Sequence, residues 1–573
     1  MSQFRRANIP WLAAAAICLV HAAVDVAASQ IDVVAISGDS SPDGNGAILI
    51  AHPPALNDAG QVAFVAGLSG TQGGTADDVV FLRSGGPGLS VIARKGVSTI
   101  DGTTITGAGL QFLGIDSDGT VNAVAAMGNP FPLQPFLADD GAIVPFMTVG
   151  SPSPSGNNSL TGSSYPPIND QGVGVFRGTY SGANAETGIY VRAADGTLST
   201  RLLQGASSPR GGTITALNPA PTINEAGDVG VRVNIGAGID PQVAVLRLAE
   251  SGVVELAREG DTADDGMTTI ETIASNQISI NDAGQMAFAA EYTQPGARRD
   301  GIFLVDEQSI RLVVPGILPQ GGTTNNMRVV GLNNAGRVAF YTEFLGIVDA
   351  GIYLTGPAGP EVIALEDAAL PTGGKFFRSF FSNSIAMNEH GQVVFLAELA
   401  NSANGPLSGR GLFLHDPQMG LQTILQTGEN FEGSTVSELL FTGTHFLLTH
   451  SPDTSFDGLN NSGQVAFAFS LANNNRGLAV WSPDIALDGD FNGDGVVDAA
   501  DYVVWRKNDG SQAGYDLWRT NFGRTAGAAS GAAPSSPRLG EPTAAVPEPA
   551  NVLLPLIASV VGVFRRRAVA RSN

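Results

Sequence analysis

The sequence is almost free of cysteine, because Cys18 is the only one in 573 residues. It lies in an N-terminal apolar run that we expect to be removed, so the mature chain should contain no thiol, which excludes disulfides and cysteine catalysis. Basic residues are also scarce, with 30 Lys and Arg against 53 Asp and Glu, for a formal net charge of −23. A surface of this charge repels nucleic acid and anionic lipid headgroups. We therefore expect no nucleic-acid partner.

The first 28 residues have the pattern of an export signal. Arg5 and Arg6 precede the apolar run IPWLAAAAICLV, and small residues follow up to Ala28. A basic start, an apolar centre and a small-residue cleavage box are typical of a secretory signal peptide. The residues around Cys18 do not form the small-residue box of a lipoprotein signal. We expect cleavage after Ala28 and export of the protein.

Turn residues are abundant, with 73 glycines and 33 prolines, which leaves no room for long helices. One turn pattern recurs eight times, with glycine three residues after Asn or Asp. The copies are LNDAGQVAF at 56–64, IDSDGTVNAVA at 115–125, INDQGVGVF at 168–176, INEAGDVGV at 223–231, INDAGQMAF at 280–288, LNNAGRVAF at 332–340, MNEHGQVVF at 387–395 and LNNSGQVAF at 459–467. Successive copies are 52 to 59 residues apart, except for a last step of 72. A period of this size indicates a solenoid or a propeller.

Each repeat is predicted to be an antiparallel sheet. Asn-Asp-Ala-Gly is typical of a tight hairpin in which glycine adopts a positive φ, so the segments before and after it become paired strands. A third strand such as GIFL at 301–304 follows, and then a fourth such as RLVV at 311–314. Val, Ile and Phe favour strands of this kind.

The strand order at the two ends decides between the two repeat architectures. Residues 31–44 match the fourth strand and its following loop, as at 253–266, whereas the last unit stops after its third strand at 477–482. The first strand of the mature chain would therefore complete the last unit and close a ring, whereas a solenoid would need capping units. We predict an all-β fold, an eight-bladed β-propeller over residues 29–484. A seven-bladed ring is the rival, because the unit at 115–125 is the most degenerate.

A metal-ligand pattern follows the repeats, in DFNGDGVVDAAD at 490–501. Its order of oxygen ligands is that of an EF-hand-type calcium loop, with Gly495 for the sharp turn. The predicted ligands are the side chains of Asp490, Asn492, Asp494, Asp498 and Asp501 and the backbone carbonyl of Val496. Asp501 is shorter than the usual Glu at the last position, so we expect calcium as the cofactor with weak to moderate affinity.

Residues 485–523 resemble a type I dockerin, whose repeats pair such a loop with one following helix. The first helix corresponds to DYVVWRKN at 501–508, and WRKN returns as WRTN within the second helix, YDLWRTNF at 515–522. The second copy lacks the ligand-rich loop, so the resemblance implies one calcium ion rather than two. It also implies docking onto a cohesin domain, and attachment to polysaccharide-degrading enzymes is common in the family.

The C-terminal residues carry a sorting pattern. An Ala, Gly, Ser and Pro-rich linker at 524–545, expected to be disordered, is followed by Pro547-Glu548-Pro549, an apolar run to Phe564 and three arginines. Fifteen apolar residues are short for a membrane span, which needs about 20. Residues 546–567 resemble the PEP-CTERM sorting signal of exported bacterial proteins. The resemblance implies membrane contact and then cleavage by an exosortase-type protease, which leaves the protein at the cell surface, outer envelope or extracellular matrix. A plain membrane anchor is the alternative.

The repeats also resemble a family of uncharacterised bacterial exported proteins that share the signature N-D-x-G-Q-V-A-F. That resemblance implies no activity. One loop in the long last step holds His445, His450 and Asp453, a candidate metal or acid–base site, although a surface loop is the favoured interpretation. The repeated Asn-Asp pairs are better explained by turn formation than by calcium.

These patterns predict a non-enzymatic exported protein of the surface or extracellular matrix. Its propeller would serve as a binding scaffold for a protein or glycan partner. The alternative is a secreted carbohydrate-active enzyme that hydrolyses or lyses polysaccharide and carries a dockerin-like module. Such an enzyme needs two carboxylates placed by geometry, which the sequence does not display.

Overall fold

The structure, a computed structural model, describes residues 30–523 with internal gaps. The gaps are 51, 73–77, 86–87, 128–132, 140, 157, 165, 183–184, 237–240, 274–276, 319–321, 346–349, 444–456, 484–488, 490, 492–496 and 509. The predicted signal peptide, linker and sorting segment lie outside the described residues. In the described part of the chain, no helix is long and apolar enough to cross a membrane.

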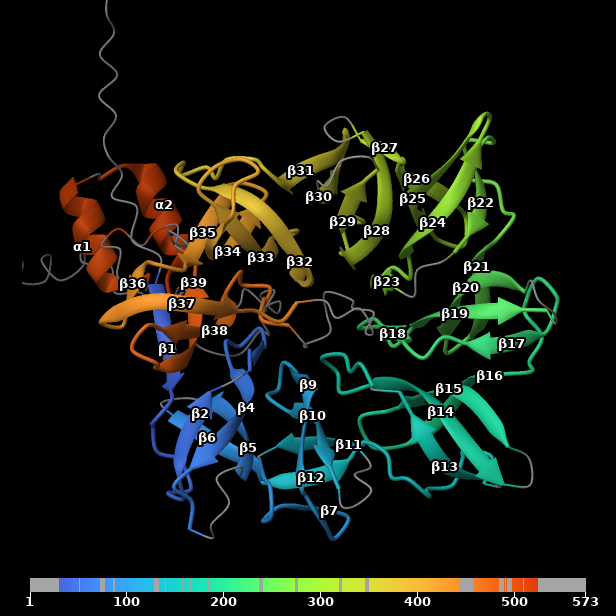
Figure 1. The fold of residues 1–573 in the computed structure, drawn as a ribbon, viewed down its shortest axis with the longest axis horizontal. Helices are drawn as coiled ribbons and strands as arrows, with labels where there is room; N and C mark the ends of the chain where they lie inside the picture. The colour runs from blue at the N-terminus through green and yellow to red at the C-terminus, as the bar shows by residue number, and fades with distance from the viewer. Residues whose placement is uncertain are drawn as a thin grey trace, which may run out of the picture. The chain divides into compact units, whose positions relative to one another are not determined.

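The described strands form eight antiparallel sheets that follow one another as the blades of a propeller (Figure 1). Blade 1 consists of β2 (Ala47–Ile50), β3 (Ala55–Leu56), β4 (Val62–Ser69), β5 (Asp78–Gly85) and β6 (Gly88–Arg94). Blade 2 consists of β9 (Gly107–Ile115), β10 (Val121–Ala126), β11 (Leu133–Asp139) and β12 (Ala142–Pro145). The hairpin of β7 (Thr99–Ile100) and β8 (Thr103–Thr104) lies between these blades in the sequence.

Blades 3 to 5 continue in chain order. Blade 3 consists of β13 (Asn158–Ser163), β14 (Gly174–Gly182), β15 (Glu186–Arg192) and β16 (Leu198–Leu203). Blade 4 consists of β17 (Ile214–Leu217), β18 (Thr222–Ile223), β19 (Val229–Ile235), β20 (Gln242–Ala249) and β21 (Gly252–Arg258). Blade 5 consists of β22 (Thr269–Thr272), β23 (Ile278–Ile280), β24 (Met286–Gln294), β25 (Ala297–Val305) and β26 (Ile310–Val314).

Blades 6 to 8 complete the ring. Blade 6 consists of β27 (Ile317–Leu318), β28 (Gly322–Leu332), β29 (Val338–Phe344), β30 (Ala350–Gly356) and β31 (Gly359–Leu365). Blade 7 consists of β32 (Phe376–Met387), β33 (Val393–Ala400), β34 (Leu407–Asp416) and β35 (Gly420–Gln426). Blade 8 consists of β36 (Asn430–Phe431), β37 (Ser434–Leu440), β38 (Val465–Leu471), β39 (Arg476–Ser482) and β1 (Gln30–Ile36).

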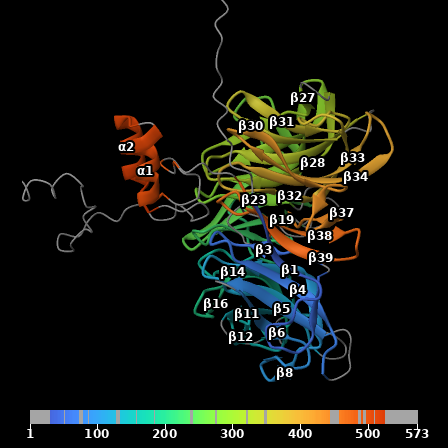
Figure 2. The ribbon, with the colours of Figure 1, turned by 90° about the vertical axis from the view of Figure 1, so that its left-hand side faces the viewer.

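The N-terminal strand closes the ring, as the strand order predicted. β1 pairs antiparallel with β39, with Gln30 opposite Ser482 and Ile36 opposite Gly477, so the two ends of the propeller lie side by side (Figure 2). This pairing confirms the propeller and contradicts the solenoid. The seven-bladed alternative is wrong, because the degenerate unit at 115–125 contributes β10 to a four-stranded sheet of its own.

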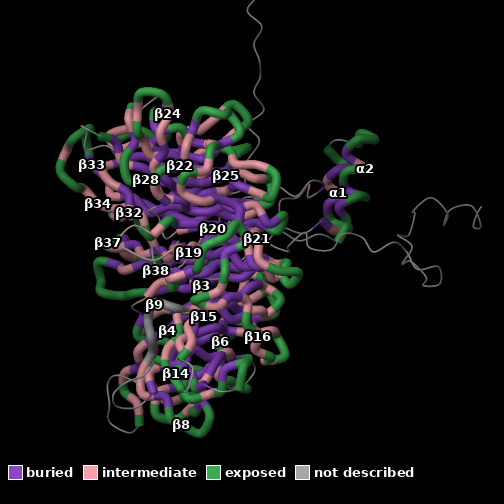
Figure 3. The backbone as a smooth tube through the Cα atoms, turned by 90° about the vertical axis from the view of Figure 1, so that its right-hand side faces the viewer, coloured by how far each residue is buried: buried purple, intermediate pink, exposed green. Residues whose placement is uncertain are grey.

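The core of the ring lies between neighbouring blades. Val245 of blade 4, for example, packs in one buried cluster with Phe288 and Phe303 of blade 5. Figure 3 shows the buried residues concentrated along the strands and the exposed ones at the loops. Each blade buries a face only when another blade covers it, which is the physical reason why the repeats must close on themselves.

Two helices follow the propeller within the described residues, α1 (Ala499–Asn508) and α2 (Gln512–Asn521). The second helix begins at Gln512 rather than at the predicted residue 515. Ser511 caps it by accepting a hydrogen bond from the Gly514 backbone amide at 3.0 Å, and this N-cap was not recognised in the sequence.

Candidate functional site

The repeated turns form a polar ring that joins neighbouring blades. In the turn at 281–285, the Asn281 side-chain oxygen accepts the Gln285 backbone amide at 3.0 Å, and Gly284 has φ of +72°. This is the hairpin geometry that the sequence predicted, and it explains why glycine recurs at this position. The asparagine is fully buried, although its side chain is polar. A buried amide needs partners for both its oxygen and its nitrogen.

The amide nitrogen finds its partner in the next blade. Seven turn asparagines each donate Nδ2–H to a backbone carbonyl of the following turn, at 2.8 to 3.1 Å. The donors and acceptors are Asn57 to Asp116, Asn169 to Asn224, Asn224 to Asn281, Asn281 to Asn333, Asn333 to Glu389, Asn388 to Asn460 and Asn460 to Asn57. We call this set the amide ring. The last bond joins residues 403 positions apart and links the last blade to the first.

A second set of bonds runs parallel to the first. The residue after six of these seven asparagines uses its side-chain oxygen to accept a backbone amide from the preceding blade. The pairs, donor first, are Asp170 to Glu225, Glu225 to Asp282, Asp282 to Asn334, Asn334 to Glu389, Glu389 to Asn461 and Asn461 to Asp58. The acidic residues of the repeats therefore act as hydrogen-bond acceptors between blades. This explains their recurrence without a metal ion.

The same arrangement brings carboxylates close to one another. Burial is the largest cause that raises the pKa of Glu225 to about 7, and the carboxylates of Asp170, Asp282 and Asp58 contribute to this rise. Burial also raises the pKa of Glu389 to about 7, with a smaller contribution from Asp282. Both groups therefore exchange a proton near neutral pH. Among the described residues, no three His, Asp or Glu side chains are arranged to hold a metal ion.

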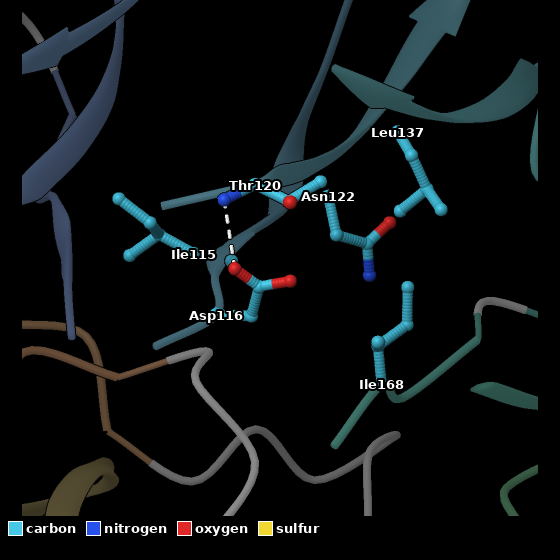
Figure 4. A pocket seen from close by; sticks show the side chains of 7 residues that line it. Ile115, Asp116, Thr120, Asn122, Leu137 and Ile168 are labelled. Carbon is cyan, nitrogen blue, oxygen red and sulfur yellow. Dashed lines mark hydrogen bonds between the residues drawn. The ribbon is translucent and has the colours of Figure 1, made fainter. Parts of the chain in front are cut away.

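Blade 2 interrupts the amide ring. Its turn has Asp116 where the other turns have Asn, and a carboxylate has no N–H to donate. Asp116 Oδ1 accepts the Thr120 backbone amide at 2.7 Å, as the asparagine oxygens do in their own turns. Beside it lies a small cavity, about large enough for one water molecule, lined in part by Asn122 and by Ile168 of blade 3 (Figure 4).

The structure describes only part of the predicted calcium loop. Asp490, Asn492, Asp494 and Val496 lie outside the described residues. Asp498 and Asp501 lie together at the start of α1, where Asp501 Oδ2 accepts the Asp498 backbone amide at 2.7 Å. Asp498 Oδ1 in turn accepts the Ala500 amide at 2.6 Å and caps the helix. These two residues lie close together, and all six predicted ligands remain predictions.

The two helices pack through aromatic rings. Trp505 and Trp518, which stand at equivalent places in the WRKN and WRTN segments, are both buried, at 8% and 4% exposure. The rings of Tyr502 and Tyr515 lie between them, and Tyr502 is 5.1 Å from Trp518. Trp518 Nε1 donates to the Asp498 carbonyl at 2.7 Å, so α2 contacts the last part of the loop directly. Sequence reasoning missed the tyrosines, although they recur three residues before each tryptophan.

The candidate site at His445, His450 and Asp453 lies outside the described residues, and it stays a prediction. The amide ring was also missed, although the sequence contained its signal. An asparagine at the same position of seven turns is more than an isolated hairpin requires, because aspartate serves equally well as the acceptor within the turn. The two residue types differ because only asparagine also has a side-chain N–H to donate.

The solved structures that align with the chain are distant from it in sequence and in structure. Solved structures that align with the chain include an oligogalacturonate lyase in complex with manganese, at 12% identity and a TM-score of 0.32, over 63% of this chain and 85% of that one. The β-propeller domain of the trilobed protease from Pyrococcus furiosus aligns at 10% identity and a TM-score of 0.36, over 67% and 99%. A polysaccharide lyase, an ulvan lyase, aligns at 11% and 0.31, over 67% and 96%. At these values the likenesses carry no argument about activity.

No curated protein matches the chain. The model of a protein family of unknown function does match the chain, over two overlapping segments, residues 22–206 and 181–486. The two segments together contain all eight repeated turns and the closing strand. The chain therefore belongs to this family of unknown function, DUF7453.

Proposed function

We propose that the protein is an exported, non-enzymatic scaffold of the bacterial cell surface or extracellular matrix, whose propeller binds a protein or glycan partner. The observation that carries this proposal is that the repeated polar residues form hydrogen bonds between blades. The turn asparagines and the residues after them are hydrogen-bonded between blades, so the most repeated polar residues hold the ring together. A ring fixed in this way holds its connecting loops on a rigid frame. Binding residues concentrate on loops that are held in this way.

One observation favours an enzyme as the second candidate. Glu225 and Glu389 have pKa values raised to about 7, and a carboxyl group that titrates near neutral pH is suited to act as a general acid. The alternative function is therefore hydrolysis or lysis of a polysaccharide. It would use these carboxyl groups in addition to their role between blades.

A binding and cleavage screen separates the two candidates. The mature chain, residues 29–545, is applied to a glycan array and to soluble polysaccharides, with calcium or with a chelator. We expect binding without cleavage. The double variant Glu225→Gln and Glu389→Gln should bind as the parent does, because each amide oxygen can still accept the neighbouring backbone N–H. The control Glu361→Gln changes an exposed carboxylate paired with Arg337. Cleavage by the parent and by the control, lost in the double variant, would establish the enzyme instead.

We further propose that residues 485–523 bind one calcium ion through Asp490, Asn492, Asp494, Asp498, Asp501 and the carbonyl of Val496. Support comes from the ligand order in the sequence and from the contact of α2 with the Asp498 carbonyl. Calcium would order the start of the loop and fix the two helices. Adding an isolated cohesin domain to the binding screen tests whether this module docks onto one.

The C-terminal residues are proposed to direct the protein to the cell surface by cleavage near Pro547-Glu548-Pro549. Replacing these three residues by alanine should leave the apolar run uncleaved and retain the protein in the membrane fraction, because the motif is what the protease would recognise. Mass spectrometry of the C-terminus measures the processing. The control Pro534→Ala with Pro537→Ala, in the linker, should be processed normally. Normal processing of the alanine variant would leave a plain membrane anchor as the better explanation.

A further inference from the structure

The joint between blades 2 and 3 differs from the other joints in its polar contacts. In the amide ring, Asn57 makes the bond from blade 1 to blade 2, at 2.8 Å. Asn169 makes the bond from blade 3 to blade 4, at 2.9 Å. Between them Asp116 supplies no N–H. Between the described residues of this joint, Ser117 Oγ donates to the Asp170 carbonyl at a long 3.4 Å, and Asn122 Nδ2 donates to the Pro166 carbonyl at 3.2 Å.

The apolar contacts at the same joint are also the least extensive. Among the described residues, the cluster that joins blades 2 and 3 has seven buried members, whereas the clusters at the other joints have thirteen or more. Several of these seven residues, such as Tyr180 and Tyr190, lie in blade 3, so blade 2 contributes few of them. The cavity beside Asp116 lies at this joint, between Asn122 and Ile168. Fewer apolar contacts leave more of the stability of this joint to its hydrogen bonds.

We propose that the joint between blades 2 and 3 is a proton-controlled seam, which Asp116 holds closed when its carboxyl group is protonated and loosens when it is ionised. A protonated carboxyl has the same shape as the asparagine amide, and its O–H can donate to blade 3 where Nδ2–H donates elsewhere. An ionised carboxylate has no hydrogen that it could donate across the joint. Its charge is also partly desolvated there, which adds to the cost.

The charges around Asp116 favour the protonated form. Burial raises its pKa, and Asp118 in the same turn raises it further, although the Thr120 amide acts against both. From blade 1, the Arg83 guanidinium binds the Gly119 carbonyl and the Asp139 carboxylate, so its charge is shared with another acid. From blade 3, the acidic residue in contact with this turn is Asp170, whose carbonyl accepts the Ser117 hydroxyl.

The sign of the pH effect follows from the raised pKa. A carboxyl group whose pKa is higher in the folded state stabilises that state below its unfolded value of 3.8, and loses this contribution as pH rises through the folded value. The seam should therefore be tightest below pH 3.8 and should loosen as the pH rises through the raised pKa of Asp116. Glu225 and Glu389, which lie in other blades, also titrate near pH 7. The test must therefore show which segment of the chain responds to pH.

Hydrogen exchange of the mature chain, read by mass spectrometry, gives that location. In Asp116→Asn, we expect peptides covering 115–126 and 166–176 to exchange about tenfold more slowly than in the parent at pH 7.5, after correction for intrinsic rates, because one interblade hydrogen bond is restored. As the pH is lowered toward 3.8, the difference between the parent and the variant should decrease. Peptides of blades 5 and 6 should be unchanged.

The reciprocal variant Asn281→Asp is the matched control. It places the same carboxyl group at the joint between blades 5 and 6 and should create there the pH-dependent exchange that the parent shows at blades 2 and 3. Equal exchange of parent and Asp116→Asn at pH 7.5 would overturn the proposal. So would a parent seam that responds to added calcium or a chelator and not to pH, because the cavity would then hold a cation.

Discussion

Deletion of residues 29–40 removes the closing strand, and we expect it to lower the stability of the propeller more than the loss of any one interblade hydrogen bond. β1 pairs with β39 along its length, and Ala35 is buried between blades 8 and 1. Ile31, Val33 and Ile36 pack against the cluster that joins blades 7 and 8. Loss of these contacts and of the strand pairing should cost about 5 kcal/mol of unfolding free energy. Thermal and denaturant unfolding of residues 41–545 against residues 29–545 measure the loss.

A peptide of residues 29–40 provides the control for this experiment. Added in trans, it should bind the open edge of β39 and restore much of the lost stability, because the missing strand contributes by pairing with that edge. A scrambled peptide of the same composition should have no effect. A deletion variant that unfolds like the parent would show that ring closure contributes nothing to the stability of the propeller.

Calcium should bind with a stoichiometry of one per chain and raise the stability of the helical module. Binding energy that exists only in the folded module stabilises it by mass action, by ~2.7 kcal/mol when calcium is present at about a hundred times Kd. Asp490→Ala together with Asp494→Ala removes two of the predicted ligands and should abolish this gain while the propeller unfolds as before. Titration calorimetry of residues 29–545 measures the stoichiometry.

Tryptophan fluorescence reports on the module within the same chain. Trp518 binds the carbonyl of Asp498, so ordering of the loop should change the emission of Trp518 and of its neighbour Trp505. The control Asp516→Ala removes a carboxylate of α2 that accepts the Gln512 side-chain amide and lies outside the loop. It should leave calcium binding unchanged. A stoichiometry near zero would contradict the calcium site, and a value near two would mean that the second half also binds an ion.

Local chemistry determined a large part of this protein. The turn at each repeat follows from Asn and Gly, whose preferences act over four or five residues, and the strands follow from the apolar runs that flank it. The closing strand was predictable for the same reason, because residues 31–44 repeat a local pattern found at 253–266. The helices at 499–508 and 512–521 were recognised from the tandem WRKN and WRTN segments, although both begin earlier than the predicted residues 501 and 515.

Only the tertiary structure decided which groups meet between blades. The amide of Asn460 and the carbonyl of Asn57 are 403 residues apart, and no local preference pairs them. The raised pKa of Glu225 likewise depends on burial and on carboxylates from three other blades. The sequence showed that Asp116 departs from the repeated asparagine, but not that this substitution removes a bond to blade 3. A repeat pattern fixes the unit through short-range chemistry, whereas the contacts that close the ring depend on how the units stack.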